Sequence, residues 1–313
     1  MTDRILDFSL EPTSLSSRIG LLVIEQKDKS EITIPFADIA VIITAHPQVN
    51  YTNAVLANLM EAGGAFIVCN NKYLPVGMLL PISAHSTQGE RFLKQARASL
   101  PTCKQIWKQI ISAKIKNQGK LLKDLYDDDQ GLIAMSKNVK SGDSENLESQ
   151  ASRRYWQHLF ANEKFSRNRD AQDQNRFLNY GYTVLRAITA RAICSAGLHP
   201  SIGIHHHNRY NAYCLADDLM EPFRPIVDRA VVNLVKEKGP SAPLDKDAKA
   251  KIISALTDRF QLEGESRTLF DIISRTASSL AQIFEGKNKQ KNLQNLQRMI
   301  IGLVLFITIV QSK

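Results

Sequence analysis

Ile39-Ala-Val-Ile-Ile43 is an unbroken run of five apolar residues, and its length and branched side chains predict a buried strand. Short segments of similar character lie on both sides of it, namely residues 19–24, 32–34, 65–69 and 74–80. Residues 52–62 have helical spacing instead and end at Gly63-Gly64, a pair that stops helices. Short strands with a single helix predict a small β-rich domain with a role in assembly.

The character of the sequence changes after about residue 88. Glycine and proline become rarer, and helical periodicity continues to the end of the chain. We therefore place a boundary near residues 85–89. The prediction is an α+β protein of two domains, with a small β-rich domain at 1–85 and a larger all-α domain at 86–313.

The composition is that of a globular protein. The 313 residues are 43% hydrophobic and 23% charged, which is enough for two domains with separate cores. The acid-containing N-terminus is unlike an export signal, and no two of the four cysteines form a CxxC pair, so we expect a cytoplasmic protein with reduced thiols. The apolar run 299–310 has twelve residues, whereas a membrane span needs roughly 20. This run predicts a buried last helix or a self-association face, and no membrane contact.

Positive charge is concentrated in one segment. Lysine and arginine number 40 against 31 acids, a formal net charge of +9. From Arg91 to Lys123 there is no acid, and we call the nine basic residues of this segment the basic track: 91, 94, 97, 104, 108, 114, 116, 120 and 123. A solvated helical face usually carries interspersed acids, which these stripes lack. The pattern favours a track for a nucleic-acid backbone.

A second basic set, in residues 151–191, contains aromatic residues. Tyr155, Trp156, Tyr180 and Tyr182 lie among eight arginines and lysines. Arginine with aromatics suits backbone clamping and base stacking at opened DNA ends. The equally good alternative is packed aromatics beside arginines whose stems lie along apolar surface.

The densest polar stretch lies between His199 and Arg224. It contains the triplet His205-His206-His207. Adjacent residues of a helix or strand cannot all point at one ion, so at most one of the three histidines is expected to bind it. Asp218 and Glu221 follow at a spacing that puts both on one face of a helix. Imidazole with carboxylates is a donor set that suits Mg²⁺ or Mn²⁺.

An upstream segment offers a further carboxylate. Ser144 is a plausible helix N-cap, and Glu148 then shares a face with Ser152 and Tyr155, which can point inward. From this segment alone, the preferred interpretation of Glu148 is an ordinary surface acid.

Three motifs in order resemble one protein family. They are Glu148-Ser-Gln-Ala-Ser-Arg-Arg-Tyr-Trp156, Gly197-Leu-His-Pro-Ser-Ile-Gly-Ile-His-His206 and Leu215-Ala-Asp-Asp-Leu-Met-Glu-Pro-Phe-Arg-Pro-Ile-Val-Asp228. The chain is similar to the CRISPR-associated spacer-acquisition integrases, the universal first member of the Cas set. The residues of the second and third motifs resemble those found in the type II branch of this family. The resemblance extends over the whole chain.

The resemblance implies a metal site and a set of partners. It implies one Mg²⁺ or Mn²⁺ on Glu148, His206 and Glu221 as catalytic ligands, with Asp218 as a helper or alternate ligand and His205 as a possible substitute for His206. It also implies a β-rich N-terminal domain, an α-helical catalytic domain and a homodimer. Two such dimers would be bridged by a dimer of a smaller Cas partner.

The implied reaction is transesterification on double-stranded DNA. The 3′-hydroxyl of a short duplex, the new spacer, would attack a phosphodiester at the edge of a CRISPR repeat, and water in its place would give endonuclease activity. Two alternatives stay open. One is a structure-selective nuclease for branched DNA in repair, and the other is a non-catalytic DNA-binding scaffold.

Overall fold

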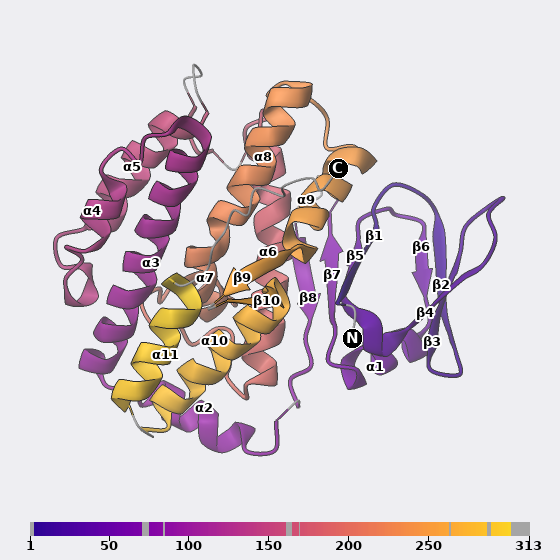
Figure 1. Cartoon of the computed structure of the whole chain (residues 1–313). Helices are drawn as coiled ribbons and strands as arrows, with labels where there is room; N and C mark the ends of the chain where they lie inside the picture. Colours follow the sequence, from indigo (N-terminus) through magenta and orange to yellow (C-terminus); the bar gives the residue numbers. More distant parts are fainter. Residues whose placement is uncertain are drawn as a thin grey trace.

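The structure is a computed structural model that describes residues 3–70, 75–83, 85–160, 165–168, 170–262, 264–286 and 289–301. Its β-rich part contains two four-stranded sheets (Figure 1). The first sheet has the order β1 (Arg4–Phe8), β5 (Ile39–Thr44), β7 (Ala65–Cys69) and β8 (Pro75–Leu79). The second has the order β4 (Ile32–Pro35), β3 (Leu21–Glu25), β2 (Thr13–Arg18) and β6 (Val49–Tyr51). The short turn η1 (Phe36–Asp38) and helix α1 (Asn53–Glu61) connect them.

Strand β5 is the central wall between two hydrophobic cores. It pairs in parallel with β1 and with β7, and all six of its residues are buried, which confirms the buried strand predicted from residues 39–43. Successive side chains of a strand point to opposite faces. Accordingly Ile42 packs with Leu59 of α1 in the β-rich core, while Val41 and Ile43 belong to the larger core of the helical part.

The helical part is built around α3 (Leu100–Tyr126), which packs against most of its neighbours. Figure 1 shows α2 at its base and α5 and α4 along one side, with α8, α6 and α9 between α3 and the first sheet. The bounds of the other helices and helical turns are α2 (Gln88–Ala96), α4 (Leu132–Ser136), η2 (Ser141–Asp143), α5 (Leu147–Leu159), α6 (Asn175–Ser195), α7 (Cys214–Met220), η3 (Glu221–Phe223), α8 (Arg224–Lys238), α9 (Lys246–Thr257), α10 (Leu269–Phe284) and α11 (Lys289–Ile301).

The part beyond residue 85 is not purely α-helical. Strands β9 (Arg259–Leu262) and β10 (Glu265–Thr268) form an antiparallel pair between α9 and α10, so the prediction of an all-α second domain is wrong at this point. Each strand has four residues, too few for the alternation of apolar and polar residues to stand out in a helical sequence. The overall α+β class is as predicted.

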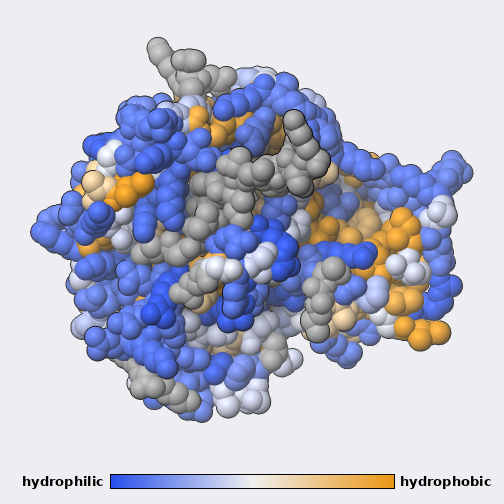
Figure 2. Space-filling view, in the orientation of Figure 1, coloured by the Kyte–Doolittle hydropathy of each residue, from blue (hydrophilic) through white to orange (hydrophobic). Residues whose placement is uncertain are grey.

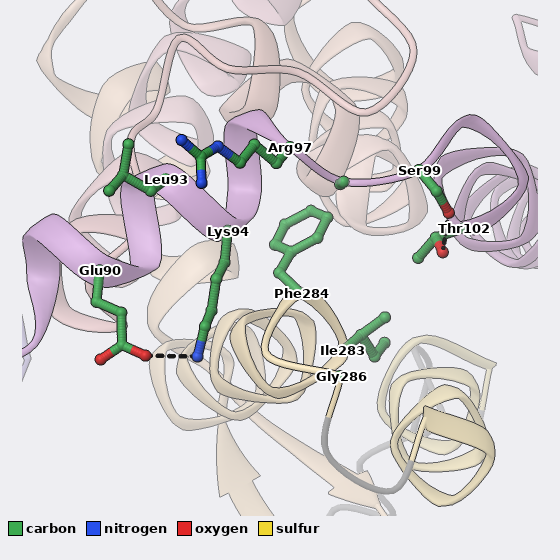
Figure 3. Close-up of a pocket in the computed structure, with 10 residues that line it drawn as sticks. Glu90, Leu93, Lys94, Arg97, Ser99, Thr102, Ile283, Phe284 and Gly286 are labelled. Atoms are coloured by element: carbon green, nitrogen blue, oxygen red, sulfur yellow. Dashed lines mark hydrogen bonds and ion pairs between the residues drawn. The ribbon is translucent and has the colours of Figure 1, made fainter.

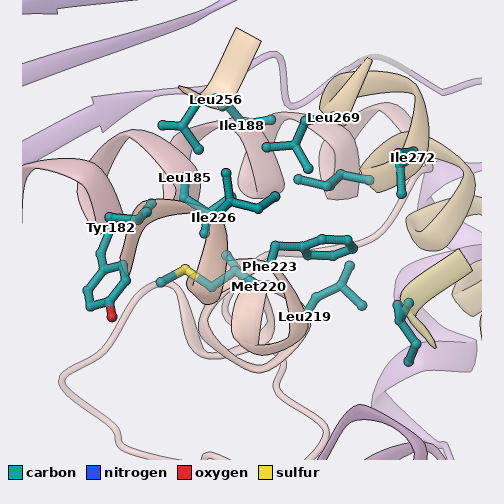
Figure 4. Close-up of a cluster of buried hydrophobic side chains, with 14 of the residues drawn as sticks. Tyr182, Leu185, Ile188, Leu219, Met220, Phe223, Ile226, Leu256, Leu269 and Ile272 are labelled. Carbon is teal, nitrogen blue, oxygen red and sulfur yellow. The ribbon is translucent and has the colours of Figure 1, made fainter. Parts of the chain in front are cut away.

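A continuous apolar cluster fixes the turn between α7 and η3. Figure 4 shows Leu219, Met220 and Phe223 from α7 and η3 packed against Leu185 and Ile188 of α6. Leu219 and Phe223 are fully buried, and Met220 is nearly so. Because protein cores are densely packed, residues on this turn have little freedom to shift.

A hollow of about 410 Å³ lies between α2 and the end of α10, beside the Lys94–Glu90 ion pair (Figure 3). It borders Ser99 and Thr102 at the start of α3, far along the helix from the site described below. Within the described residues, no helix is long and apolar enough to cross a membrane. Most of the apolar run 299–310 lies outside the described residues.

Candidate metal centre

Two of the three predicted ligands converge on a buried lysine. Lys114 of α3 is 8% exposed, and its Nζ lies 2.7 Å from Glu148 Oε1 and 2.7 Å from Glu221 Oε2. The sequence interpretation placed Lys114 in the basic track for DNA, and this is wrong. In the helix, Lys114 lies on the face opposite Lys116 and Lys123, so it points into the protein and balances the two carboxylates.

Glu148 is held by the first turn of α5. Asp143 Oδ1 accepts the backbone N–H of Leu147 at 2.9 Å, and its Oδ2 accepts that of Glu148 at 3.0 Å. The Asp143 side chain therefore caps this helix, whose N-cap residue is Asn146, and the predicted cap at Ser144 is wrong. A carboxylate offers two acceptor oxygens and a charge favoured at a helix N-terminus, whereas a serine offers one neutral oxygen. The side of α5 that carries Glu148 and Tyr155 faces inward as predicted, since Tyr155 is fully buried.

Glu221 is fixed by the tight turn between α7 and α8. Pro222 follows it, and the Pro222 carbonyl accepts a hydrogen bond from Asn117 Nδ2 at 2.9 Å, which ties the turn to α3. Arg224 Nε lies 3.0 Å from Glu221 Oε1. Glu221 Oε2 is buried and has Lys114 Nζ beside it, but no described group donates to it in hydrogen-bond geometry.

The charges of this site stabilise one another. Burial alone raises the pKa of the Glu221 carboxyl, but Arg224 and Lys114 outweigh burial and bring it below its usual value. Burial lowers the pKa of Lys114, and Glu221 and Glu148 more than reverse that effect. At neutral pH the site therefore holds an ionised carboxylate against an ammonium group, and not two neutral groups.

His206 is oriented by Asp218. The Asp218 carboxylate is fully buried and accepts the backbone N–H groups of Ile204 at 2.7 Å and of His205 at 2.9 Å. The same carboxylate pairs with His206 Nδ1, and this hydrogen bond, opposed by burial, raises the pKa of His206. With Nδ1 engaged, Nε2 is the nitrogen left to bind a ligand, which is how a carboxylate commonly orients a metal-binding histidine.

The neighbouring histidine is held differently. The His205 ring stacks on Trp107 with ring centroids 4.2 Å apart and planes within 3°. Burial, followed by the influence of His206, lowers the pKa of His205. His206 meets Trp107 only with its edge, at 5.6 Å. The stacking explains how two adjacent histidines come to have separate environments on one loop.

A buried network behind Glu221 was missed by the sequence interpretation. Asp228 accepts a hydrogen bond from Tyr155 at 2.6 Å and another from Tyr182, and the guanidinium of Arg224 lies over the Tyr182 ring at 4.6 Å. Burial, partly offset by the two tyrosine hydroxyls, raises the pKa of Asp228 to about 6. Tyr182 and Asp228 thus lie behind the arginine that faces Glu221.

Three of the four aromatic residues of the second basic set are core residues, and the fourth, Trp156, is half-buried against Tyr155 and Phe165. Tyr155, Tyr180 and Tyr182 are buried, and Tyr180 donates its hydroxyl to Asp7 Oδ2 at 2.6 Å. Their proposed role in stacking on opened DNA ends is wrong, because buried rings cannot receive bases. Arg186 and Arg191 are likewise engaged within the protein, by Asp217 and by the Gly63 carbonyl.

Fewer residues of the basic track are exposed than the sequence suggests. Arg91 is bound by Glu285 at 2.8 Å and by the Ala196 carbonyl at 2.7 Å, and Lys94 pairs with Glu90. Five lysines lie on one side of α3, and we call them the lysine stripe: the exposed Lys104, Lys108 and Lys123 and the half-buried Lys116 and Lys120. Burial, followed by the charge of Lys116, lowers the pKa of Lys120.

The donor set fits a hard divalent cation, although the donors do not yet surround a common point. Among the described residues, no three His, Cys, Asp or Glu side chains are arranged to hold a metal ion. Glu148 and Glu221 meet at the Lys114 ammonium, and His206 pairs with Asp218. Two carboxylates, one of them with a buried oxygen that accepts no hydrogen bond, and an oriented imidazole match the ligands that Mg²⁺ and Mn²⁺ prefer.

Comparison with known proteins decides the family. The family model for CRISPR associated protein Cas1 matches residues 9–256, well over half of the chain. This chain belongs to the Cas1 family. It is 34% identical over 279 residues to the CRISPR-associated endonuclease Cas1 of Neisseria meningitidis serogroup C (strain 8013), covering 88% of this chain and 91% of that protein.

Solved structures show the same fold at lower identity. A casposase bound to integration product superposes with a TM-score of 0.74 at 22% identity, covering 92% of each chain. A Cas6-RT-Cas1–Cas2 complex gives a TM-score of 0.74 at 18% identity, covering 96% of this chain and 36% of that one. The β-rich start and helical remainder are thus the architecture of the Cas1 family.

Gly203 begins the loop that presents His206, and it has no room for a side chain. A Cβ at this position would lie 2.2 Å from the His206 carbonyl oxygen and 2.9 Å from Cys214 Cβ. We expect Gly203→Ala to destabilise the protein by about 1 to 3 kcal/mol in urea unfolding, because the backbone must move. Gly89→Ala is the matched control, since its Cβ would meet no atom within 4 Å. Equal stability of the two variants would contradict the tight packing of this loop.

Proposed function

We propose that this chain is the metal-dependent DNA endonuclease and integrase of CRISPR adaptation, which joins the 3′-hydroxyl ends of short duplexes into the CRISPR array by transesterification. The observation that carries the proposal is the convergence of Glu148 and Glu221 on one cation position. The name of the Neisseria relative supports endonuclease chemistry, and the casposase neighbour supports integration.

The proposed ligands of the metal are Glu148, His206 through Nε2, and Glu221. When bound, Mg²⁺ or Mn²⁺ would supply positive charge to a phosphate under attack. Asp218 holds the His206 ring in the orientation that exposes Nε2, and Asn117 and Arg224 hold Glu221 in its turn. No side-chain nucleophile is required, because the attacking group is a hydroxyl of the DNA itself.

The lysine stripe is the proposed contact surface for DNA. Exposed lysines 104 and 108 are one helical turn apart on α3, the same helix that carries Lys114. Charged side chains at such spacing contact phosphates without reading sequence. In this proposal double-stranded DNA runs along a helix whose buried face borders the proposed metal site.

The β-rich part is the proposed assembly surface. Eight of the eleven large hydrophobic side chains exposed in the described residues lie before residue 83, and Figure 2 shows apolar surface over this part of the molecule. Exposed apolar patches mark interaction sites. We propose that it supports a homodimer and a smaller Cas2-type partner, with two dimers bridged by one partner dimer. Residues 203–208 favour assignment to the type II branch.

A repair nuclease would use the same ligands, so the test must separate joining from cutting. We expect a labelled short duplex to become covalently attached to a plasmid bearing a CRISPR repeat, in Mg²⁺ or Mn²⁺, with the Cas2-type partner present. EDTA should abolish the joined product. Cleavage of branched DNA with no joined product would favour the repair nuclease, and DNA binding without either product would favour the non-catalytic scaffold.

A further inference from the structure

The Lys114 ammonium lies where two carboxylates of the proposed metal site meet. It is the only group described within contact of both Glu148 and Glu221, and it is held by Coulomb attraction to both. The three side chains come from separate elements, namely α3, α5 and the η3 turn. The site is therefore pre-assembled around a positive charge that belongs to the protein.

A divalent cation and this ammonium cannot share the position. Glu148 and Glu221 balance Lys114 and Arg224, so the cluster is neutral as it stands. Addition of a divalent ion beside Lys114 would place two cations in contact inside a mostly buried site, where charges are poorly screened. A lysine has a flexible four-carbon stem, so its ammonium can withdraw without movement of the helix backbone.

We propose that Lys114 competes with the metal ion for Glu148 and Glu221. Its ammonium holds the two carboxylates in place in the metal-free protein and is displaced when the ion binds. This inference rests on the proposed function and adds a determinant of metal affinity to it. Its consequence is that the protein binds its ion more weakly than the same ligands would without the lysine. In exchange, the carboxylates are not left as uncompensated charges before the ion arrives.

The test is metal binding by Lys114→Met, which keeps an apolar stem and removes the charge. We expect the dissociation constant for Mn²⁺, measured by electron paramagnetic resonance or calorimetry, to fall about tenfold or more. We also expect the variant to melt at a lower temperature than wild type without metal and to gain more from Mn²⁺, because the ion replaces the missing charge. If the variant is unfolded without metal, Mn²⁺ should restore its melting transition. An unchanged or weaker affinity, or no rescue, would overturn the proposal.

Two controls separate this inference from the proposed function. Lys137→Met removes an exposed charge at the end of α4, outside the lysine stripe and the metal site, and its Mn²⁺ affinity should stay that of wild type. Glu148→Gln in the Lys114→Met background should abolish the gain. If wild type shows no Mn²⁺ binding that depends on Glu148, the proposed metal site itself fails. If that binding is present but Lys114→Met does not tighten it, only the role of Lys114 fails.

Discussion

Glu148→Gln is expected to lower the rate of strand joining in Mg²⁺ by about a hundredfold or more, while DNA binding stays close to wild type. The substitution keeps the size of the side chain and removes one of the two charges proposed to hold the ion. A metal ion supplies several kcal/mol of transition-state stabilisation, and every 1.36 kcal/mol is about a tenfold change in rate. DNA affinity should not fall, because an acid beside a phosphate backbone makes no favourable contact with it.

The chain offers a matched control for this substitution. Glu145 lies just before α5, is exposed, and pairs with Lys140, so Glu145→Gln changes the net charge equally near the same helix. Because Glu148 helps to balance the buried Lys114 charge, its replacement should lower the melting temperature, so joining is measured well below the melting temperature of both variants. The measurement is half-site joining of a labelled duplex by both variants. Wild-type joining by Glu148→Gln would remove Glu148 from the proposed ligand set.

Local patterns were enough to predict several elements. The bounds of β7 match the predicted segment 65–69, and β5 extends the predicted 39–43 by one residue. Both are continuous apolar runs, and burial on two faces leaves such a signal in any single sequence. By contrast, β2 contains three serines and only one of its faces is buried. Its alternation of apolar and polar residues therefore could not be distinguished from the polar pattern of a turn.

The site was predictable only in part, because its chemistry depends on contacts between distant segments. Glu148 and Glu221 were named from motifs, yet nothing local shows that both meet one ammonium from α3. Lys114 was assigned to the basic track because a lysine among lysines looks exposed. Only the packing of α3 between α5 and the η3 turn distinguishes it. Asp228 was missed for the same reason, since its partners Tyr155 and Tyr182 lie on two other helices.

Charge reversal in the lysine stripe is expected to weaken DNA binding. Lys104→Glu combined with Lys108→Glu is expected to weaken binding of duplex DNA by about tenfold or more at moderate salt. Each phosphate contact contributes a slope of about 0.9 to the dependence of log affinity on log salt concentration, so the slope should fall by about 2. Both lysines are exposed and lie on the outer side of α3, so the fold and the Lys114 site should be unaffected.

A double variant of equal charge change makes the result specific. Lys27 and Lys246 are exposed residues outside the lysine stripe, and Lys27→Glu with Lys246→Glu alters the net charge by the same amount. Affinity for a labelled duplex, measured over a series of salt concentrations, should keep its wild-type slope in this control. Equal slopes for the two double variants would mean that DNA responds to the overall charge of the protein and not to the stripe. A reduced slope for the α3 variant alone, with metal binding retained, would place the phosphate backbone along the outer side of the helix that carries Lys114.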